Sequence, residues 1–229
     1  MITVFGGQTS RSLRVVWLLE EMGLPYRVRQ VDLLADEEDA EFLAVNPGGF
    51  LPAIRDGGVT MVESIAIMEY LAGRYGPTPL APAPDDPAFP TYQQFLHLGE
   101  AGLATFMNVI IMCRYFAPES ERQNWAAGQA MRWIDGRRKL VAAQLAHAPY
   151  LAGDSFTAAD ISVTYALELG RKHCELVLSD AEQAYLARTT GRPAFARAME
   201  RSALSPAERP DEQPASASGA DRAEAALDG

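Results

Sequence analysis

The residues best placed to do chemistry lie in the stretch 46–64. It opens with Asn-Pro-Gly-Gly, which predicts a loop, because proline lacks an N–H and glycine accepts unusual φ values. A strand tolerates proline best at its first residue, so Pro52 would open a short apolar strand. A cis Leu51–Pro52 bond would turn the backbone groups before it outward. Ser64 is a good N-cap for the helix that follows. A loop, a strand edge and a helix N-terminus therefore meet, and together they can bind an anionic, peptide-like ligand.

A second polar turn follows the first apolar strand and carries three hydroxyls, Thr9, Ser10 and Ser12. Taken alone, these residues are typical of the N-cap of the helix expected over 11–22. A hydroxyl at this place can also donate a hydrogen bond to an anion, and the helix N-terminus adds positive potential there.

The predicted secondary structure of the elements that position these turns changes once along the chain. Up to residue 76, strand and helix signals alternate in the order β-α-β-α-β-β-α, which predicts a small mixed sheet with helices on both faces. The expected elements are strands at 2–5, 26–31 and 59–62, the apolar run from Pro52, and helices at 11–22, 36–44 and 64–75.

The rest of the chain favours helices. Residues 77–88 are a proline-rich linker, and every segment from 89 to 202 has helical patterning. Residues 203–229 are rich in Ala, Ser, Pro, Glu and Asp, which predicts a disordered acidic tail. The expected helices are 89–116, 119–147, 157–171, 180–190 and 193–202. The fold class is therefore an α/β domain of residues 1–76 packed on an all-α domain of residues 89–202.

Three motifs in order resemble the glutathione S-transferases of the bacterial, serine/threonine type, with a thioredoxin-like N-terminal domain. The resemblance spans residues 1 to 202. The first motif is the run 9–26, and the third is Phe156-Thr157-Ala158-Ala159-Asp160-Ile161-Ser162. The second, Asn-Pro-x-Gly-x-[Val/Leu]-Pro-x-[Leu/Ile] followed by Glu-Ser, is matched by Asn46, Pro47, Gly49, Leu51, Pro52, Ile54, Glu63 and Ser64.

The resemblance implies that a hydroxyl activates the thiol of glutathione, the co-substrate. A free thiol has a pKa of about 8.5, and a hydrogen bond donated to the sulfur favours the thiolate, which is the nucleophile. Ser10 heads the Ser-Arg-Ser-x-Arg-Val run, whereas aligning on Val15 by the spacing of other classes puts Thr9 in this place. Ser10 is favoured over Thr9, and the alternative stays open.

The resemblance also implies how glutathione is held. Leu51, before a cis Pro52, would pair its backbone with the cysteinyl residue, as an added strand does at a sheet edge. Ser64 would bind the γ-glutamyl carboxylate, and Glu63 the γ-glutamyl ammonium. Phe50 departs from the family, because many relatives carry Lys or Gln there to reach the glycyl carboxylate. Arg11 or Arg14 could substitute for that missing cation.

The second substrate would be a small hydrophobic electrophile. In this family the first long helix of the second domain lines the electrophile pocket, which here would include Met107, Ile111 and Tyr115. The capping-box pattern of Thr157 and Asp160 predicts a role in folding and not in chemistry. The resemblance and the apolar helices together predict a homodimer with an isologous interface.

Composition excludes several other classes. A net charge of −10 and a pI near 4.8 argue against a nucleic-acid or anionic-membrane partner. No apolar run is expected to reach the roughly 18 residues of a membrane-spanning helix, and no signal peptide is visible. Cys113 and Cys174 do not form a C-x-x-C pair, which favours a reducing cytoplasm. The histidines have no metal-site spacing, so no metal is expected.

Two other functions remain open at this level. One is a non-catalytic protein-binding module on the same fold, for which Phe50 is the best support. The other is a glutathione-dependent disulfide reductase, although the cysteine that such enzymes often carry at the helix start is absent here.

Overall fold

The N-terminal part of the chain forms a small mixed sheet with helices on both faces. The computed structural model describes residues 1–7, 10–35 and 37–203. Its strands are β1 (Ile2–Gly6), β2 (Tyr26–Gln30), β3 (Ala53–Asp56) and β4 (Val59–Val62), and its helices in this part are α1 (Ser12–Met22), α2 (Ala40–Val45) and α3 (Ser64–Tyr75). The strand order is β2-β1-β3-β4, with β1 and β2 parallel and the other neighbours antiparallel. The predicted thioredoxin-like arrangement is confirmed.

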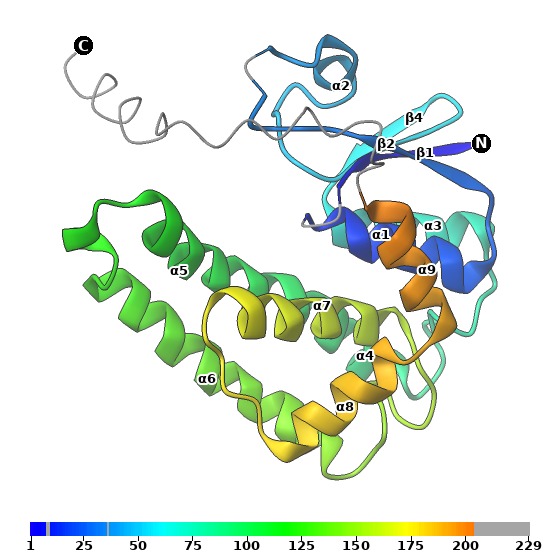
Figure 1. Ribbon diagram of the computed structural model, residues 1–229. Helices are drawn as coiled ribbons and strands as arrows, with labels where there is room; N and C mark the ends of the chain where they lie inside the picture. Colours follow the sequence, from blue (N-terminus) through cyan, green and yellow to red (C-terminus); the bar gives the residue numbers. More distant parts are fainter. Residues whose placement is uncertain (8–9, 36, 204–229) are drawn as a thin grey trace.

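The two faces of the sheet bury different clusters, because successive side chains of a strand point to opposite faces. Val4 belongs to the large core that includes residues of α1 and α3, whereas Phe5 packs against Phe42 of α2 with ring centroids 6.2 Å apart. Figure 1 shows the sheet between α2 on one side and α1 with α3 on the other. Helix α2 begins later than the expected residue 36, because the Asp39 carboxylate caps it by accepting the Phe42 N–H at 3.0 Å.

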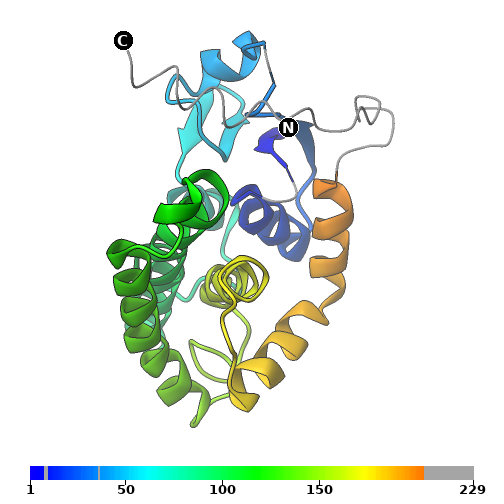
Figure 2. The same cartoon turned by 60° about the vertical axis from the view of Figure 1, so that its left-hand side comes forward.

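The second part is helical, as predicted. Its elements are α4 (Phe89–His97), the π-helical stretch η1 (Leu98–Ala104), α5 (Thr105–Phe116), the short 3-10 turn η2 (Glu119–Glu121), α6 (Trp125–Leu145), α7 (Ala158–His173), α8 (Asp180–Thr190) and α9 (Pro193–Ser202). Within the described residues from 89 onward, the only β-type pairing is an isolated bridge between Tyr150 and Gly153. Figure 2 shows α7 nearly end-on and surrounded by the other helices. The predicted acidic tail lies outside the described residues, apart from Ala203 at its start.

The continuous run Phe89–Phe116 is more apolar than expected from the sequence. An 18-residue window within it has a mean hydropathy of 1.4, so by length and composition alone it could cross a membrane, and the expectation of no such run was wrong. Phe95, Leu96 and Leu103 of this run are buried in the protein core. The apolar character of the run is therefore used, at least in part, for packing inside the molecule.

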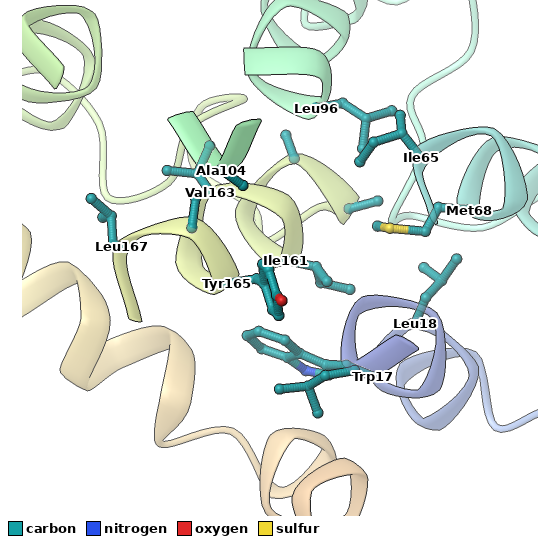
Figure 3. Close-up of a cluster of buried hydrophobic side chains, with 14 of the residues drawn as sticks. Trp17, Leu18, Ile65, Met68, Leu96, Ala104, Ile161, Val163, Tyr165 and Leu167 are labelled. Carbon is teal, nitrogen blue, oxygen red and sulfur yellow. The ribbon is translucent and has the colours of Figure 1, made fainter. Parts of the chain in front are cut away.

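One hydrophobic core joins the two parts. Figure 3 shows Trp17 of α1 beside Ile161 and Tyr165 of α7, and Leu18 of α1 beside Met68 of α3. The Trp17 ring also contacts Phe195 of α9 edge-on, with centroids 4.8 Å apart. Helix α1, which begins at the expected active-site turn, is thus fixed by the helical part of the chain and not only by its own sheet.

Candidate functional site

Three segments meet at one end of the sheet. In the sheet register, Phe5 of β1 is opposite Ala53 of β3, and Ala53 is opposite Val62 of β4. The turn after β1, the residues just before β3 and the start of α3 therefore lie at the same end, because neighbouring antiparallel strands begin and end together. The predicted residues Ser10, Leu51–Pro52 and Ser64 are brought together in this way.

The turn before α1 is held by two hydroxyls. The Ser10 Oγ donates to the Gly7 carbonyl at 2.9 Å and lies 2.6 Å from the Ser12 Oγ, which donates to the same carbonyl. A Cβ at Gly6 would overlap Ser12, so the close approach requires glycine. Ser12 is fully buried, whereas Ser10 is partly exposed. Ser10 is consequently the hydroxyl that can reach a ligand, while Thr9 lies outside the described residues.

Helix α1 begins without a side-chain cap, because Arg11 occupies its N-cap position. The Ser10 hydroxyl nevertheless accepts the Ser12 N–H at 3.3 Å, so the simpler interpretation, a local role at the helix start, accounts for part of what Ser10 does. The N-terminal end of the α1 dipole adds positive potential beside Ser10, although the first N–H groups of the helix are bonded to the Ser10 hydroxyl and to the Ser10 and Arg11 carbonyls.

The loop before β3 presents the Leu51 backbone. The Leu51–Pro52 bond is cis, as predicted. Within the described part of the chain, neither the N–H nor the C=O of Leu51 has a hydrogen-bond partner. The buried Asn46 fixes this loop, because its side chain donates to the Phe50 carbonyl at 2.6 Å and accepts from the Gly48 N–H at 3.0 Å. In the sequence Asn46 belongs to the Asn-Pro-x-Gly motif, but nothing local in that motif indicates this organising role.

The start of α3 differs in detail from the prediction. Ser64 is the first residue of the helix and not its cap, since Glu63 occupies the N-cap position without a side-chain cap bond. Glu63 has φ 69°, a left-handed value that costs a non-glycine residue about 1–3 kcal/mol. The Ser64 hydroxyl accepts a hydrogen bond from Arg14 at 3.2 Å. Within the described part of the chain, the N–H groups of Ser64, Ile65 and Ala66 have no hydrogen-bond acceptor, so the start of α3 could bind an anion.

Arg14 is fully buried where α1 meets the helical part, and it reaches the ligand end only through its hydrogen bond to the Ser64 hydroxyl. Its guanidinium is paired with the Glu100 carboxylate, donates to the Gly99 carbonyl at 3.3 Å and stacks over the Tyr165 ring at 4.3 Å. Arg11 binds the same carboxylate at 2.8 Å. Both cations are committed to Glu100, so the expectation that either could substitute at position 50 is not supported by this geometry.

The pKa values of this cluster follow from burial and pairing. Burial lowers the pKa of Arg14, although Glu100 opposes this shift. For Glu100, burial favours the neutral form, but Arg11 and Arg14 together lower its pKa to about 2. The π-helical stretch η1 brings Glu100 into place through a close approach of Gly99 to Ser162, where a Cβ would overlap. A lone acidic residue in an apolar run was the only signal for Glu100 in the sequence.

A cavity of about 300 Å³ opens beside α1. It is lined by Leu13, Trp17, Tyr165, Glu168, Leu169, Lys172, His173, Phe195 and Met199, from α1, α7 and α9. Leu13 lies one helical turn after Ser10, and its N–H donates to the Ser10 carbonyl at 3.2 Å. The cavity therefore begins close to the proposed thiol-activating hydroxyl.

The three residues predicted for the electrophile pocket do not line this cavity. Met107 is fully buried in the core, and Ile111 is half-buried against it. Tyr115 is 53% exposed, and its ring packs edge-on against His173, a cavity residue, with centroids 5.9 Å apart. Of the three, Tyr115 is thus the one associated with the cavity.

Two further motifs can be placed. The capping box at the start of α7 is confirmed, because the Asp160 carboxylate accepts the Thr157 N–H at 2.8 Å. It also accepts the Leu151 N–H at 2.9 Å and the Tyr185 hydroxyl at 3.0 Å, which ties α7 to α8. Among the described residues, no group of three or more His, Cys, Asp or Glu side chains is arranged to hold a metal ion.

Comparisons with known proteins identify the family to which this chain is similar. Residues 10–74 match the model of the glutathione S-transferase N-terminal domain. The chain is 30% identical over 178 residues to glutathione S-transferase 3 of Schizosaccharomyces pombe, covering 73% of each chain. It is 33% identical over 174 residues to the Escherichia coli K12 glutathione S-transferase GstB, covering 71% of this chain and 80% of that protein.

Solved structures show the same fold over most of the chain. A glutathione transferase from Methylococcus capsulatus superposes with a TM-score of 0.77 at 25% identity, covering 88% of this chain and 98% of that one. A theta class enzyme from Xanthomonas axonopodis pv. citri, solved with glutathione bound, superposes with a TM-score of 0.73 at 26% identity, covering 86% and 96%. The resemblance seen in the sequence is confirmed, and this chain belongs to the glutathione S-transferase family.

Proposed function

We propose that this protein binds glutathione at the end of the sheet and activates its thiol for transfer to a small hydrophobic electrophile. The observation that carries the proposal is the meeting of Ser10, the unpaired Leu51 backbone and the start of α3 at that end. The glutathione bound in the Xanthomonas relative supports the same ligand.

Glutathione would bind as a short added strand. The Leu51 N–H would donate to the cysteinyl carbonyl, and its C=O would accept the cysteinyl N–H. The γ-glutamyl carboxylate would accept from the N–H groups at the start of α3 and from the Ser64 hydroxyl. The exposed Glu63 carboxylate would pair with the γ-glutamyl ammonium.

The thiol would then lie beside Ser10, because the turn after β1 neighbours the residues before β3. A hydrogen bond from the Ser10 hydroxyl, whose single proton would turn from the Gly7 carbonyl to the sulfur, and the N-terminus of α1 both favour the thiolate. A decrease of about 2 pKa units corresponds to about 2.7 kcal/mol. The thiolate attacks the electrophilic carbon, a C–S bond forms, and the leaving group departs with its electron pair. Reduction of a peroxide by the same thiolate is an alternative reaction.

The electrophile would enter the cavity between α1, α7 and α9. Its apolar wall, including Leu13 and Leu169, suits a hydrophobic molecule, and Lys172 and His173 add polar groups at its edge. Tyr115 would extend this wall through His173. Ile111 and Met107, which the sequence predicted for the pocket, would lie near this cavity without lining it. Met107 would act only through packing.

A homodimer is part of the proposal. Large apolar side chains are exposed on the adjacent helices α5 and α6, namely Met112, Tyr115, Phe116, Trp125 and Trp133. An exposed apolar surface of this kind marks an interaction site in many soluble proteins. A reducing cytoplasm fits the proposal, because Cys113 and Cys174 are both free thiols.

The test is retention on immobilised glutathione with elution by free glutathione, followed by a conjugation assay with an activated aryl halide. Retention and conjugation are both expected. Retention without conjugation or peroxide reduction would favour the non-catalytic binding module instead. Reduction of glutathione mixed disulfides without conjugation would favour the disulfide reductase.

The role of Ser10 is tested by Ser10→Ala, with Ser12→Ala and Thr9→Ala as controls. Ser10→Ala should raise the pKa of bound glutathione, followed by thiolate absorbance, and slow conjugation with little change in glutathione affinity. Loss of one preorganised donor costs ~10²-fold at an oxyanion, and we expect less at a polarisable sulfur. If Thr9→Ala shifts the curve and Ser10→Ala does not, Thr9 is the activating residue.

A further inference from the structure

The proposed pairing at Leu51 determines which residue of the protein lies opposite the C-terminal end of the thiol ligand. When one residue exchanges both its N–H and its C=O with one partner residue, the two strands are antiparallel. The γ-glutamyl end of the ligand then points toward Pro52 and α3, where the anion-binding N–H groups lie. The third residue of the ligand points the other way and lies opposite Phe50.

Phe50 offers that third residue an apolar ring and no cation. Its side chain is 40% exposed, and its ring packs on Gly48, where an added Cβ would lie 2.9 Å from a ring carbon. The Phe50 carbonyl already accepts from Asn46. Neither the ring nor this carbonyl can donate a hydrogen bond to a carboxylate.

The segment that contains Phe50 has the wrong charge for a carboxylate. Residues 31–54 contain no Lys, Arg or His and six acidic residues. The flanking cations are engaged with that same segment, since Arg29 binds Asp39 at 2.8 Å and Arg55 lies 3.8 Å from Glu41. Glu37 and Glu38 are exposed and have no hydrogen-bond or ion-pair partner within the described part of the chain. The segment that contains Phe50 therefore carries net negative charge, which disfavours a free carboxylate on a ligand bound along it.

From this geometry we infer that the protein prefers a γ-glutamyl-cysteinyl thiol whose third residue ends in an uncharged group, such as an ester or amide, over glutathione with its free glycyl carboxylate. The inference rests on the proposed function, because it uses the ligand pairing at Leu51. Phe50 is the specificity-determining residue, and its ring would cover the neutral end of the ligand. The acidic segment 31–54 disfavours the charged end.

The test compares the affinities of glutathione and its glycyl ethyl ester by calorimetry at low ionic strength. We expect the ester to bind a few-fold more tightly, because a unit charge several ångströms away through water changes an affinity only about two-fold. Because charges beyond about 10 Å are screened at 0.1 M salt, the preference should shrink in high salt, through tighter glutathione binding. Tighter binding of glutathione than of the ester at low salt would overturn the inference.

Substitutions distinguish the effect of the Phe50 ring on binding from the effect of the acidic residues. Phe50→Lys should strengthen glutathione binding several-fold and leave the ester affinity within two-fold, whereas Phe50→Leu should keep the ester preference. Glu37→Gln with Glu38→Gln should reduce the preference by tightening glutathione alone. The matched control, Asp85→Asn with Asp154→Asn, removes the same charge from the linker and the loop before α7, away from α2 in both views (Figures 1 and 2), and should change neither affinity.

The outcomes distinguish a failure of the proposed function from a failure of the inference about the third residue of the ligand. If neither thiol binds the wild-type protein, the proposed function fails, and the inference fails with it. If both bind and glutathione binds more tightly, the proposed function stands and the inference fails. If Phe50→Lys leaves the ratio of the two affinities unchanged, Phe50 is not the specificity-determining residue.

Discussion

Replacing Glu100 by Gln tests whether a buried ion pair fastens α1 to the helical part of the molecule. The substitution keeps the shape of the side chain and removes the charge that faces Arg14. Arg14 is fully buried, and its other partners are the neutral Ser64 hydroxyl and the Gly99 and Ser162 carbonyls. The variant would thus hold a buried cation without a counter-charge.

The loss of stability expected for Glu100→Gln is about 3 kcal/mol on two physical grounds. Removing one partner of a buried pair costs about 3–5 kcal/mol, and Glu100 belongs at the low end because its side chain is 20% exposed. Independently, the pKa of Glu100 falls from 4.5 to about 2 in the folded protein. A decrease of this size corresponds to about 3 kcal/mol of stability. We therefore expect Glu100→Gln to lower the free energy of unfolding by about 3 kcal/mol and the Tm by roughly 6–12 °C.

The pH dependence has a definite sign. Because the folded-state pKa of Glu100 is lowered, its stabilising contribution is complete above the unfolded value of 4.5 and is lost as the pH falls through about 2. The difference in stability between wild type and Glu100→Gln should accordingly be constant near neutral pH and close between pH 4.5 and 2.

The assay is urea unfolding followed both by tryptophan fluorescence and by circular dichroism, whose coincidence checks that unfolding is two-state. The matched control is Asp135→Asn, because Asp135 is 56% exposed and pairs with Arg138 at the surface at 3.2 Å. This control should change stability by less than about 0.5 kcal/mol. A loss of the same small size for Glu100→Gln at pH 7, or a loss that persists at pH 2, would refute the reasoning.

Further predictions concern folding, the cavity and assembly. Asp160→Ala should lower the free energy of unfolding by about 3 kcal/mol, measured by the urea midpoint, because the Thr157 and Leu151 N–H groups lose their acceptor; an unchanged midpoint would contradict this. Leu169→Trp should fill part of the cavity of about 300 Å³ and raise the KM for the electrophile more than tenfold. The KM for glutathione should stay within two-fold. Equal changes in the two KM values would show that the electrophile binds elsewhere. Light scattering at micromolar concentration should give the mass of a dimer, and Trp125→Glu should shift it toward the monomer, whereas a monomeric wild type would exclude the proposed assembly.

The sequence by itself determined the secondary structure and the ligand end of the sheet. Alternating strand and helix signals, and the turn residues between them, act over a few neighbours in the chain, so β4 and the boundaries of α8 and α9 match the predicted residues. The motif containing Leu51, Pro52 and Ser64 was identifiable for the same reason, since its loop and helix start are local features. The start of α2 was missed because the capping residue Asp39 follows several other acidic residues that could equally begin a helix.

Contacts between distant residues were decided only by the tertiary structure. Nothing local indicates that Arg14 and Glu100, 86 positions apart, share one buried site, or that η1 brings Glu100 there. Helical periodicity places Met107 on an apolar face of its helix, but core positions and pocket positions both lie on such faces. Which apolar side chains are covered depends on how α1, α7 and α9 pack together, and so the cavity beside Leu13 became visible only in the folded molecule.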